Sequence, residues 1–241
     1  MDDLANALKS YEGELEVDRG IYNADPDDMR RMLDLAWTLN KLGDFQRRLK
    51  NLAAARTSFD EMMGLEHRLL DREPDSKARH RKVLDGLNKL AGLLSDMGDF
   101  TAARQTYASL AQADERWLAV ARQLSTKAAN DETRADVVQA YGDAGWHSLL
   151  GGRTQASAQH SEAALKLDGS KTWIRVNLGH AYLLLGRIEE ARAIYVAVRN
   201  INRSDDGKRK YSDEIRDDFA LFRKLGIGVE AMDRMAKDIG I

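Results

Sequence analysis

The chain has 241 residues, of which 37 are Lys or Arg, 39 are Asp or Glu and none is Cys. The net charge of −2 lacks the basic excess of a nucleic-acid-binding protein, and the missing thiols exclude disulfides and cysteine-ligated metals. The absence of cysteine fits a reducing compartment, so we expect a cytoplasmic protein, and the absence of a long apolar run predicts no membrane insertion.

Residues of the same kind recur at fixed intervals along the chain. Ala55 returns as Ala103, 48 positions later, and further on the interval shortens to 34, as at Gly145 and Gly179. The chain contains only two prolines and is rich in helix-forming residues. Repetition every few tens of residues in such a chain predicts stacked helix pairs, a solenoid, rather than one closed core.

The first expected helix, within residues 1–27, ends before Pro26, because proline and the residue before it resist helical geometry. Its apolar side chains form one stripe: Leu4, Leu8, Tyr11 and Leu15. This helix would be the second of a pair whose first helix is missing, so we expect the chain to be a segment of a longer protein. The alternative is an acidic N-terminal cap, since residues 1–28 alone carry −7.

Four helix pairs are expected next, at 28–76, 77–131, 132–169 and 170–203, each with a helix A followed by a helix B. In the first of them we place the turn at Lys50-Asn51 and keep Gly43 inside helix A, where a small residue allows close helix contact. The side chains expected in the core sit at equivalent places of the B helices: Ala55, Phe59, Ala103, Tyr107, Ala191 and Tyr195.

Residues 204–241 are expected to form a linker, a capping helix and a short terminal helix. The capping helix carries apolar side chains three or four residues apart: Tyr211, Ile215, Phe219 and Phe222. A solenoid needs such a helix to cover its last unit. The alternative is a mobile segment that docks elsewhere, because methionines such as Met232 and Met235 suit adaptable contacts.

The fifth unit has an aromatic residue, Leu-Gly and Tyr in helix A, then a Gly turn, and Ala with an aromatic residue in helix B: Trp173, Leu178, Gly179, Tyr182, Gly186, Ala191 and Tyr195. This pattern resembles the tetratricopeptide repeat (TPR), and the resemblance extends over about 3–203. The longer units, with Leu-Asn-Lys-Leu at 39–42 and 87–90, resemble the kinesin-light-chain subtype common in bacterial multidomain signalling proteins. The resemblance implies an all-α, right-handed solenoid of antiparallel helix pairs with a C-terminal capping helix.

The fourth unit departs from this pattern. Tyr141 stands at the place of Leu39 and Leu87, and Ser157 stands at the place of Ala191. We therefore expect this unit to be loosely packed.

The resemblance also implies a concave groove, lined by the A helices, that holds a peptide or a partner segment. The side chains that we expect to face it are Trp37, Asn40, Lys41, Asp44, Arg47, Asn88, Lys89, Trp146, Trp173, Asn177 and His180. Asn40 and Asn88 lie 48 residues apart and could each bond a peptide backbone, although a solvated surface position or a bond between helices explains them equally well. The tryptophans could anchor a partner, or pack between adjacent helices.

The expected partner is a protein or peptide segment, or another domain of the same longer chain. Positive charge in the first half of the groove favours an acidic segment: Lys41, Arg47, Arg48 and Lys89. The lysine–asparagine pairs are not followed by a basic pair in the next A helix, so we do not expect a carboxylate clamp for chaperone tails.

The sequence shows no signature of catalysis. The five histidines lack metal-ligand spacing, and the Gly151-Gly152 segment lacks the length and the lysine of a phosphate loop. We therefore expect no enzyme, no metal and no cofactor. Two other functions stay open: a self-associating structural module with an empty groove, and a small-molecule sensor that uses the half of the groove around Trp146 and Trp173.

Overall fold

The computed structural model describes residues 2–204 and 207–241. The described residues form eleven α-helices: α1 (Asp2–Ala24), α2 (Met29–Arg48), α3 (Leu52–Arg72), α4 (Lys77–Asp96), α5 (Phe100–Lys127), α6 (Asp131–Leu150), α7 (Thr154–Leu167), α8 (Thr172–Leu184), α9 (Ile188–Val198), α10 (Tyr211–Lys224) and α11 (Val229–Ile239). The fold is all-α, as the sequence predicts. No helix in this described part is both long and apolar enough to cross a bilayer.

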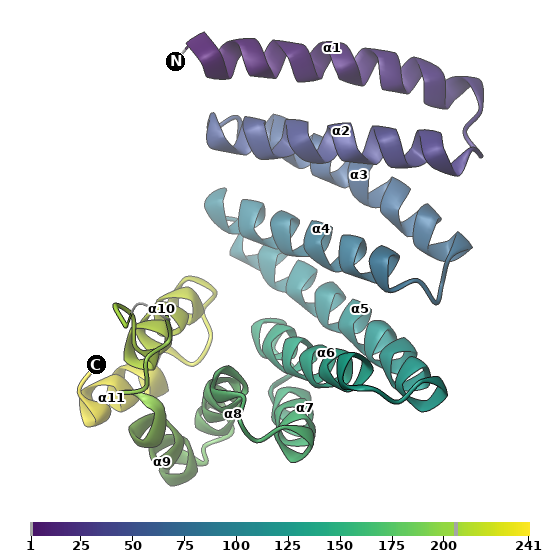
Figure 1. Ribbon diagram of the computed structural model, residues 1–241. Coiled ribbons are helices and arrows are strands. Elements are labelled where there is room, and N and C mark those ends of the chain that lie inside the picture. Colours follow the sequence, from purple (N-terminus) through teal and green to yellow (C-terminus); the bar gives the residue numbers. More distant parts are fainter. Residues whose placement is uncertain (1, 205–206) are drawn as a thin grey trace. The chain divides into compact units, whose positions relative to one another are not determined.

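The chain divides into two compact units, residues 1–106 and 107–241, with the boundary inside α5. In the first unit α1 packs on α2, α2 on α3 and α3 on α4. In the second, α6 packs on α7, α7 on α8 and α8 on α9, and α6 also contacts α8. Within each unit, successive helices turn back beside one another (Figure 1). The assignment of residues 1–203 to five repeats remains a proposal.

Short polar side chains start three of the A helices, α2, α4 and α6. The Asp28 carboxylate accepts the backbone N–H groups of Arg30 and Arg31, and these bonds lower the pKa of Asp28. Ser76 caps α4, and Asn130 forms a capping box at the start of α6. Each cap satisfies backbone donors that a helix leaves without partners at its N-terminus.

Close contacts between helices explain where the small residues lie. A Cβ added to Gly43 would lie 2.6 Å from the ring of Phe59, and one added to Gly179 would lie 2.9 Å from Tyr195. Gly43 is therefore inside α2, as predicted, and the turn lies at 49–51, where Lys50 has φ of +63°. The alanines expected in the core, Ala55 and Ala191, are fully buried.

The apolar stripe of α1 is covered in its described part. The ring of Tyr11 lies 5.0 Å from that of Phe45 and 6.5 Å from that of Trp37, and Leu15 is buried. The side chain of Leu4 lies outside the described residues. At Tyr11 the stripe therefore packs against α2, the helix that follows.

The fourth repeat, which comprises α6 and α7, is packed more closely than expected. A Cβ on Gly145 would lie 2.7 Å from the hydroxyl of Ser161, and Ser157 is fully buried. What distinguishes α6 and α7 is polarity, because the hydroxyls of Ser148, Ser157 and Ser161 have no hydrogen-bond partner among the described residues. The expectation of loose packing is therefore wrong. The two helices lie close together, and the departure from the repeat pattern changes the polarity of the buried side chains instead.

The C-terminal helices bury their apolar faces in the second unit. Tyr211, Ile215, Phe219 and Phe222 are all buried along α10. The rings of Phe219 and of Tyr195 on α9 are nearly perpendicular to each other, and their centres are 5.9 Å apart. An isolated antiparallel bridge between Asn202 and Lys210 closes the loop before α10.

Candidate functional site

The first candidate surface lies on α2 and α4, where Lys89 joins the two helices. Its ammonium group donates to Asn40 Oδ1 at 2.7 Å and to Asp44 Oδ2 at 2.9 Å, and it lies 3.6 Å from Asp85. Asn40 and Lys89, both expected to face a ligand, therefore bind each other. The positive charge of Lys89 is shared between two carboxylates.

Arg47 makes a second bridge between these helices. Its guanidinium group lies 2.7 Å from the carboxylate of Asp96 and packs over Gly92, whose added Cβ would lie 3.2 Å from it. Glycine at position 92 leaves room for this side chain. Two of the four basic residues expected to attract an acidic ligand are thus neutralised within the protein.

Trp37 and Asn88 are the members of this surface most accessible to solvent. Trp37 is 48 % exposed, and the ammonium group of Lys41 lies 5.5 Å from the centre of its ring. Asn88 is exposed, and its side chain makes no hydrogen bond with the described residues. Asn40 and Asn88 occupy equivalent positions in the repeat. The side chain of Asn40 is hydrogen-bonded to Lys89, whereas that of Asn88 is available to a ligand.

A pocket of about 230 Å³ lies beside Trp37. It is lined by Leu33, Asp34, Ala36, Trp37, Asn40, Met62, Glu66, Lys82 and Asp85. Burial raises the pKa of Glu66, whose Oε2 has no hydrogen-bond partner in the described chain. The pocket therefore combines one indole with three carboxylates and one ammonium group, among apolar and amide side chains.

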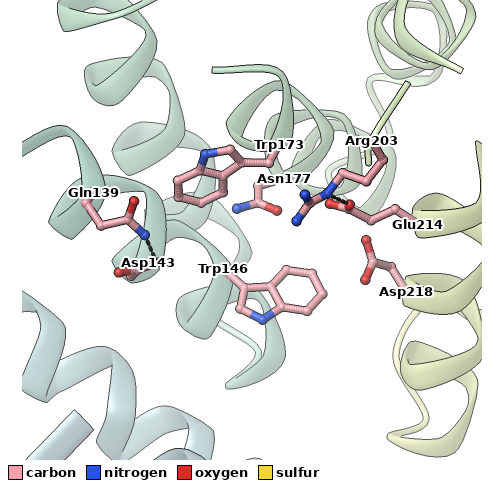
Figure 2. Close-up of a pocket in the computed structure, with 8 residues that line it drawn as sticks. All are labelled: Gln139, Asp143, Trp146, Trp173, Asn177, Arg203, Glu214 and Asp218. Atoms are coloured by element: carbon pink, nitrogen blue, oxygen red, sulfur yellow. Dashed lines mark hydrogen bonds and ion pairs between the residues drawn. The ribbon is translucent and has the colours of Figure 1, made fainter. Parts of the chain in front are cut away.

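The second candidate surface is a pocket of about 380 Å³ in the second unit. Its lining comes from α6, α8, α10 and the loop before α10: Gln139, Asp143, Trp146, Trp173, Asn177, Arg203, Glu214 and Asp218. Figure 2 shows the indoles of Trp173 and Trp146 on two sides of the pocket, with the amide of Asn177 between them. Sequence reasoning found the two tryptophans and Asn177 and missed the C-terminal residues.

Both indoles are held by packing as well as facing this pocket. Trp173 lies directly against the backbone of Gly142, where an added Cβ would collide with its ring. Trp146 packs on Phe222 of α10, with ring centres 5.6 Å apart. Packing between helices, one of the two alternatives considered for the tryptophans, therefore holds for Trp146 and Trp173, and anchoring of a partner stays a prediction.

His180 does not belong to an accessible surface. Its side chain is fully buried, with Nδ1 2.8 Å from the hydroxyl of Tyr195 and Nε2 3.1 Å from the carboxylate of Asp218. Phe219 and Phe222 of α10 contact its ring. The expectation that His180 faces the groove is therefore wrong, because the C-terminal helix covers it.

The comparisons with known proteins agree on the repeat. Residues 148–208 match the family model of the tetratricopeptide repeat. The chain is similar to the crystal structure of BtubC (BKLC) from P. vanneervenii, with 14 % identity, a TM-score of 0.50, and 98 % of this chain and 89 % of that chain covered. This protein has a tetratricopeptide-repeat fold.

A second structural match is a tetratricopeptide repeat protein from Parabacteroides merdae. Its identity to this chain is 15 % and its TM-score is 0.35, over 98 % of this chain and 97 % of that chain. No curated protein matches the sequence.

The second unit also holds a buried Asp–His hydrogen bond that sequence reasoning missed. Asp114 of α5 is fully buried, and its Oδ2 lies 2.6 Å from Nδ1 of His147 on α6. Burial raises the pKa of Asp114, and the bond to His147 opposes that rise. The signal was an acidic residue in the otherwise apolar stripe of Leu110, Ala111 and Trp117.

Within residues 2–204 and 207–241, no three His, Cys, Asp or Glu side chains come together as metal ligands would.

Proposed function

We propose that the chain is a protein–protein interaction module that binds a partner segment on the outward surface of α2 and α4. Tetratricopeptide repeats generally serve as scaffolds for protein partners. The α2/α4 surface, defined by Trp37, Asn40, Lys41 and Asn88, offers an indole, an ammonium group and amides to such a segment. The proposal includes no catalytic activity.

The observation that carries this proposal is the exposure of Trp37. A tryptophan that leaves 48 % of its surface in water forgoes much of the free energy of burying an indole. Tryptophan is also among the residues that most often dominate binding energies at interfaces. A partner that covers Trp37 and fills the neighbouring pocket would recover that burial.

The charge of this surface changes one expectation about the partner. Lys89 and Arg47 are bound to Asp44 and Asp96, which leaves little positive charge to attract an acidic segment. We therefore propose recognition through the backbone and apolar groups of the partner, without a preference for acidic residues. A cytoplasmic location and a place in a larger bacterial signalling protein remain part of the proposal, on the basis of composition and resemblance alone.

Affinity capture from a lysate of the source cells tests the proposal. We compare the wild type with a Trp37→Ala/Asn88→Ala variant, and with a control variant, Leu167→Ala/Val196→Ala, that removes exposed apolar surface from the B helices α7 and α9. Circular dichroism and thermal melting establish that all three proteins are folded. We expect a captured protein that the control retains and the α2/α4 variant loses.

The affinity of that captured protein, measured by calorimetry, should fall at least tenfold in the double variant, because truncating central interface residues typically costs more than about 1.4 kcal/mol. Equal capture by all three proteins would contradict the proposal. Loss from the control alone would assign binding to the B helices instead.

A further inference from the structure

The pocket beside Trp37 contains a buried carboxylate that no group of the described chain binds. Glu66 of α3 is only 6 % exposed, yet it lines this pocket of about 230 Å³ together with residues of α2 and α4. Its Oε2 is buried without a hydrogen-bond partner, and its carboxylate forms no ion pair within the described chain. A buried acceptor without a donor costs free energy, which a ligand that donates a hydrogen bond to this carboxylate would recover.

A full charge of either sign is disfavoured in this pocket. An anion would face three carboxylates, those of Asp34, Glu66 and Asp85. A cation would meet the ammonium group of Lys82, which lines the pocket and is the main charge that attracts Glu66. The carboxylate of Asp85 also lies 3.6 Å from the ammonium group of Lys89 already. A neutral ligand group avoids both repulsions.

A hydroxyl is a neutral group that suits both Glu66 and Lys82. It has one O–H donor and two acceptor lone pairs, so it can donate to a carboxylate and accept from an ammonium group at the same time. Glu66 and Lys82 attract each other without a direct ion pair in the described chain, which leaves both of them able to bind such an oxygen. The exposed Lys82 has a flexible four-carbon stem that can adjust to it.

The rest of the lining favours an aromatic ring beside that hydroxyl. Leu33, Ala36 and Met62 supply apolar contacts, and Trp37 supplies an indole. The sulfur of a methionine makes favourable contacts with aromatic rings, and two aromatic rings attract each other in offset or edge-to-face arrangements. Because Trp37 is 48 % exposed, a ring placed on it would remove apolar surface of both partners from water.

We propose that this pocket, called here the Trp37 pocket, binds the side chain of a tyrosine in the partner polypeptide. The inference rests on the proposed function, because the pocket belongs to the α2/α4 surface on which the partner lies. The tyrosine ring packs against Trp37 and Met62. Its phenol O–H donates a hydrogen bond to the carboxylate of Glu66, and the phenol oxygen accepts one from the ammonium group of Lys82.

Nuclear magnetic resonance on the whole chain tests this proposal with three defined probes. The probes are N-acetyl-tyrosine amide, N-acetyl-phenylalanine amide, which lacks the hydroxyl, and N-acetyl-O-phosphotyrosine amide, in which the hydroxyl is replaced by an anion. The indole N–H signal of Trp37 is assigned through the variant Trp37→Phe. The signals of Trp117, Trp146 and Trp173 serve as internal controls, because none of these residues lines the Trp37 pocket.

We expect the tyrosine probe to shift the signal of Trp37 with a dissociation constant on the order of millimolar, and to leave the three control signals in place. The phenylalanine probe should bind at least about threefold more weakly, because it makes no hydrogen bond to Glu66. The phosphotyrosine probe should bind more weakly than the tyrosine probe, since its phosphate faces the carboxylates of the pocket.

Two variants test the polar groups separately. Glu66→Met replaces the carboxylate with an apolar side chain, and Lys82→Met removes the ammonium group from an exposed position. Each should reduce the preference for tyrosine over phenylalanine to less than about twofold. Glu12→Met, at an exposed position of α1 outside the pocket, should leave the preference unchanged. Circular dichroism establishes that the variants are folded, and Lys82→Met decides the test if Glu66→Met does not fold.

Four results would overturn the proposal: no shift of the Trp37 signal with the tyrosine probe, equal shifts of all four tryptophan signals, equal affinities for tyrosine and phenylalanine, or phosphotyrosine as the tightest ligand. The last would assign the pocket to an anion bound by Lys82. A preference for tyrosine that survives in every folded variant would also contradict it.

The outcome is distinguishable from that of the capture experiment. Capture that depends on Trp37 and Asn88, without a preference for the tyrosine probe, would refute this inference and leave the proposed function intact. A preference for tyrosine together with equal capture by all three proteins would refute the proposed function and leave the chemistry of the Trp37 pocket intact.

Discussion

At the scale of single residues, the environment of a side chain decides whether a repeated position is structural or available. His180 lies on the same face of α8 as Trp173, and from spacing alone the two are indistinguishable. The structure buries His180 between Tyr195 and Asp218, whereas Trp173 lines a pocket. The difference comes from α10, a helix more than thirty residues later, which periodicity within α8 does not report.

Ser157 provides a test of the core at this scale. It occupies the place that Ala55 and Ala191 fill in other units, and its hydroxyl is buried without a hydrogen-bond partner among the described residues. We expect Ser157→Ala to stabilise the chain by up to about 1 kcal/mol, because the change removes an unsatisfied polar group. Urea unfolding measures the difference, with the exposed Ser109→Ala as a control. A lower stability for Ser157→Ala would show that the hydroxyl is satisfied in solution.

The pH dependence of stability tests the environment of Glu66. Its pKa is raised in the folded protein, chiefly by burial. The stability that such a group contributes is fully present below its unfolded pKa of about 4.3 and is lost as the pH rises through the folded pKa, where the folded chain must bury a charge. The variant Glu66→Gln has no such loss.

We therefore expect the stability of Glu66→Gln relative to the wild type to increase as the pH rises from about 4 to 7. Urea unfolding at several pH values across this range measures the trend, and Glu132→Gln on the exposed surface of α6 serves as the control. A flat or falling difference would contradict the burial of a carboxylate at position 66.

At the scale of helices, contacts between neighbouring helices decide whether a Gly-Asp-Phe sequence forms a turn. The string Gly-Asp-Phe occurs at 43–45 and at 98–100. At the second site Gly98 has φ of +78° and ends the helix, whereas Gly43 lies within α2 under the ring of Phe59. Local sequence alone gives both sites the same preference for a turn. The alignment of the repeats was needed to predict that Gly43 lies inside a helix.

Two helical glycines with opposite surroundings test this account. In Gly142→Ala the new Cβ collides with the ring of Trp173, so we expect a loss of about 1–3 kcal/mol. In Gly64→Ala the new Cβ meets no atom within 4 Å in α3, so we expect a gain of about 0.5–1 kcal/mol from helix propensity. Thermal and urea unfolding of both variants measure the two signs. Equal effects would show that the contact of Trp173 with α6 does not hold in solution.

At the scale of the whole molecule, the sequence predicts the class of fold far better than the binding surface. Repeated small residues, caps and apolar spacing lie within single helix pairs, and for this reason the place of Gly43 inside a helix and the turn at Lys50-Asn51 could be predicted. Surface chemistry depends on contacts between units of the repeat and on the C-terminal helices. No local pattern predicts that Lys89 bonds Asn40. None predicts that Arg203 and Asp218 line the pocket of the second unit.

The charge of the molecule illustrates the same limit. The basic residues of α2 and α4 predicted an acidic ligand, but the carboxylates of Asp44 and Asp96 neutralise two of them. Three of the eight residues that line the pocket of the second unit carry a carboxylate, and one carries a guanidinium group. A count of charges along the chain gives no information on which of them form pairs, and the pairing sets the preference for a ligand.

The central claim is that the outward surface of α2 and α4, and not the B helices, binds a protein partner. Site-specific photo-crosslinking tests it most directly, with a benzophenone side chain in place of Asn88 on α4 or, as the control, in place of Val196 on α9. The account predicts an adduct with a second protein from position 88 and none from position 196. An adduct from position 196 alone, or an adduct from position 88 only with another copy of this chain, would contradict it.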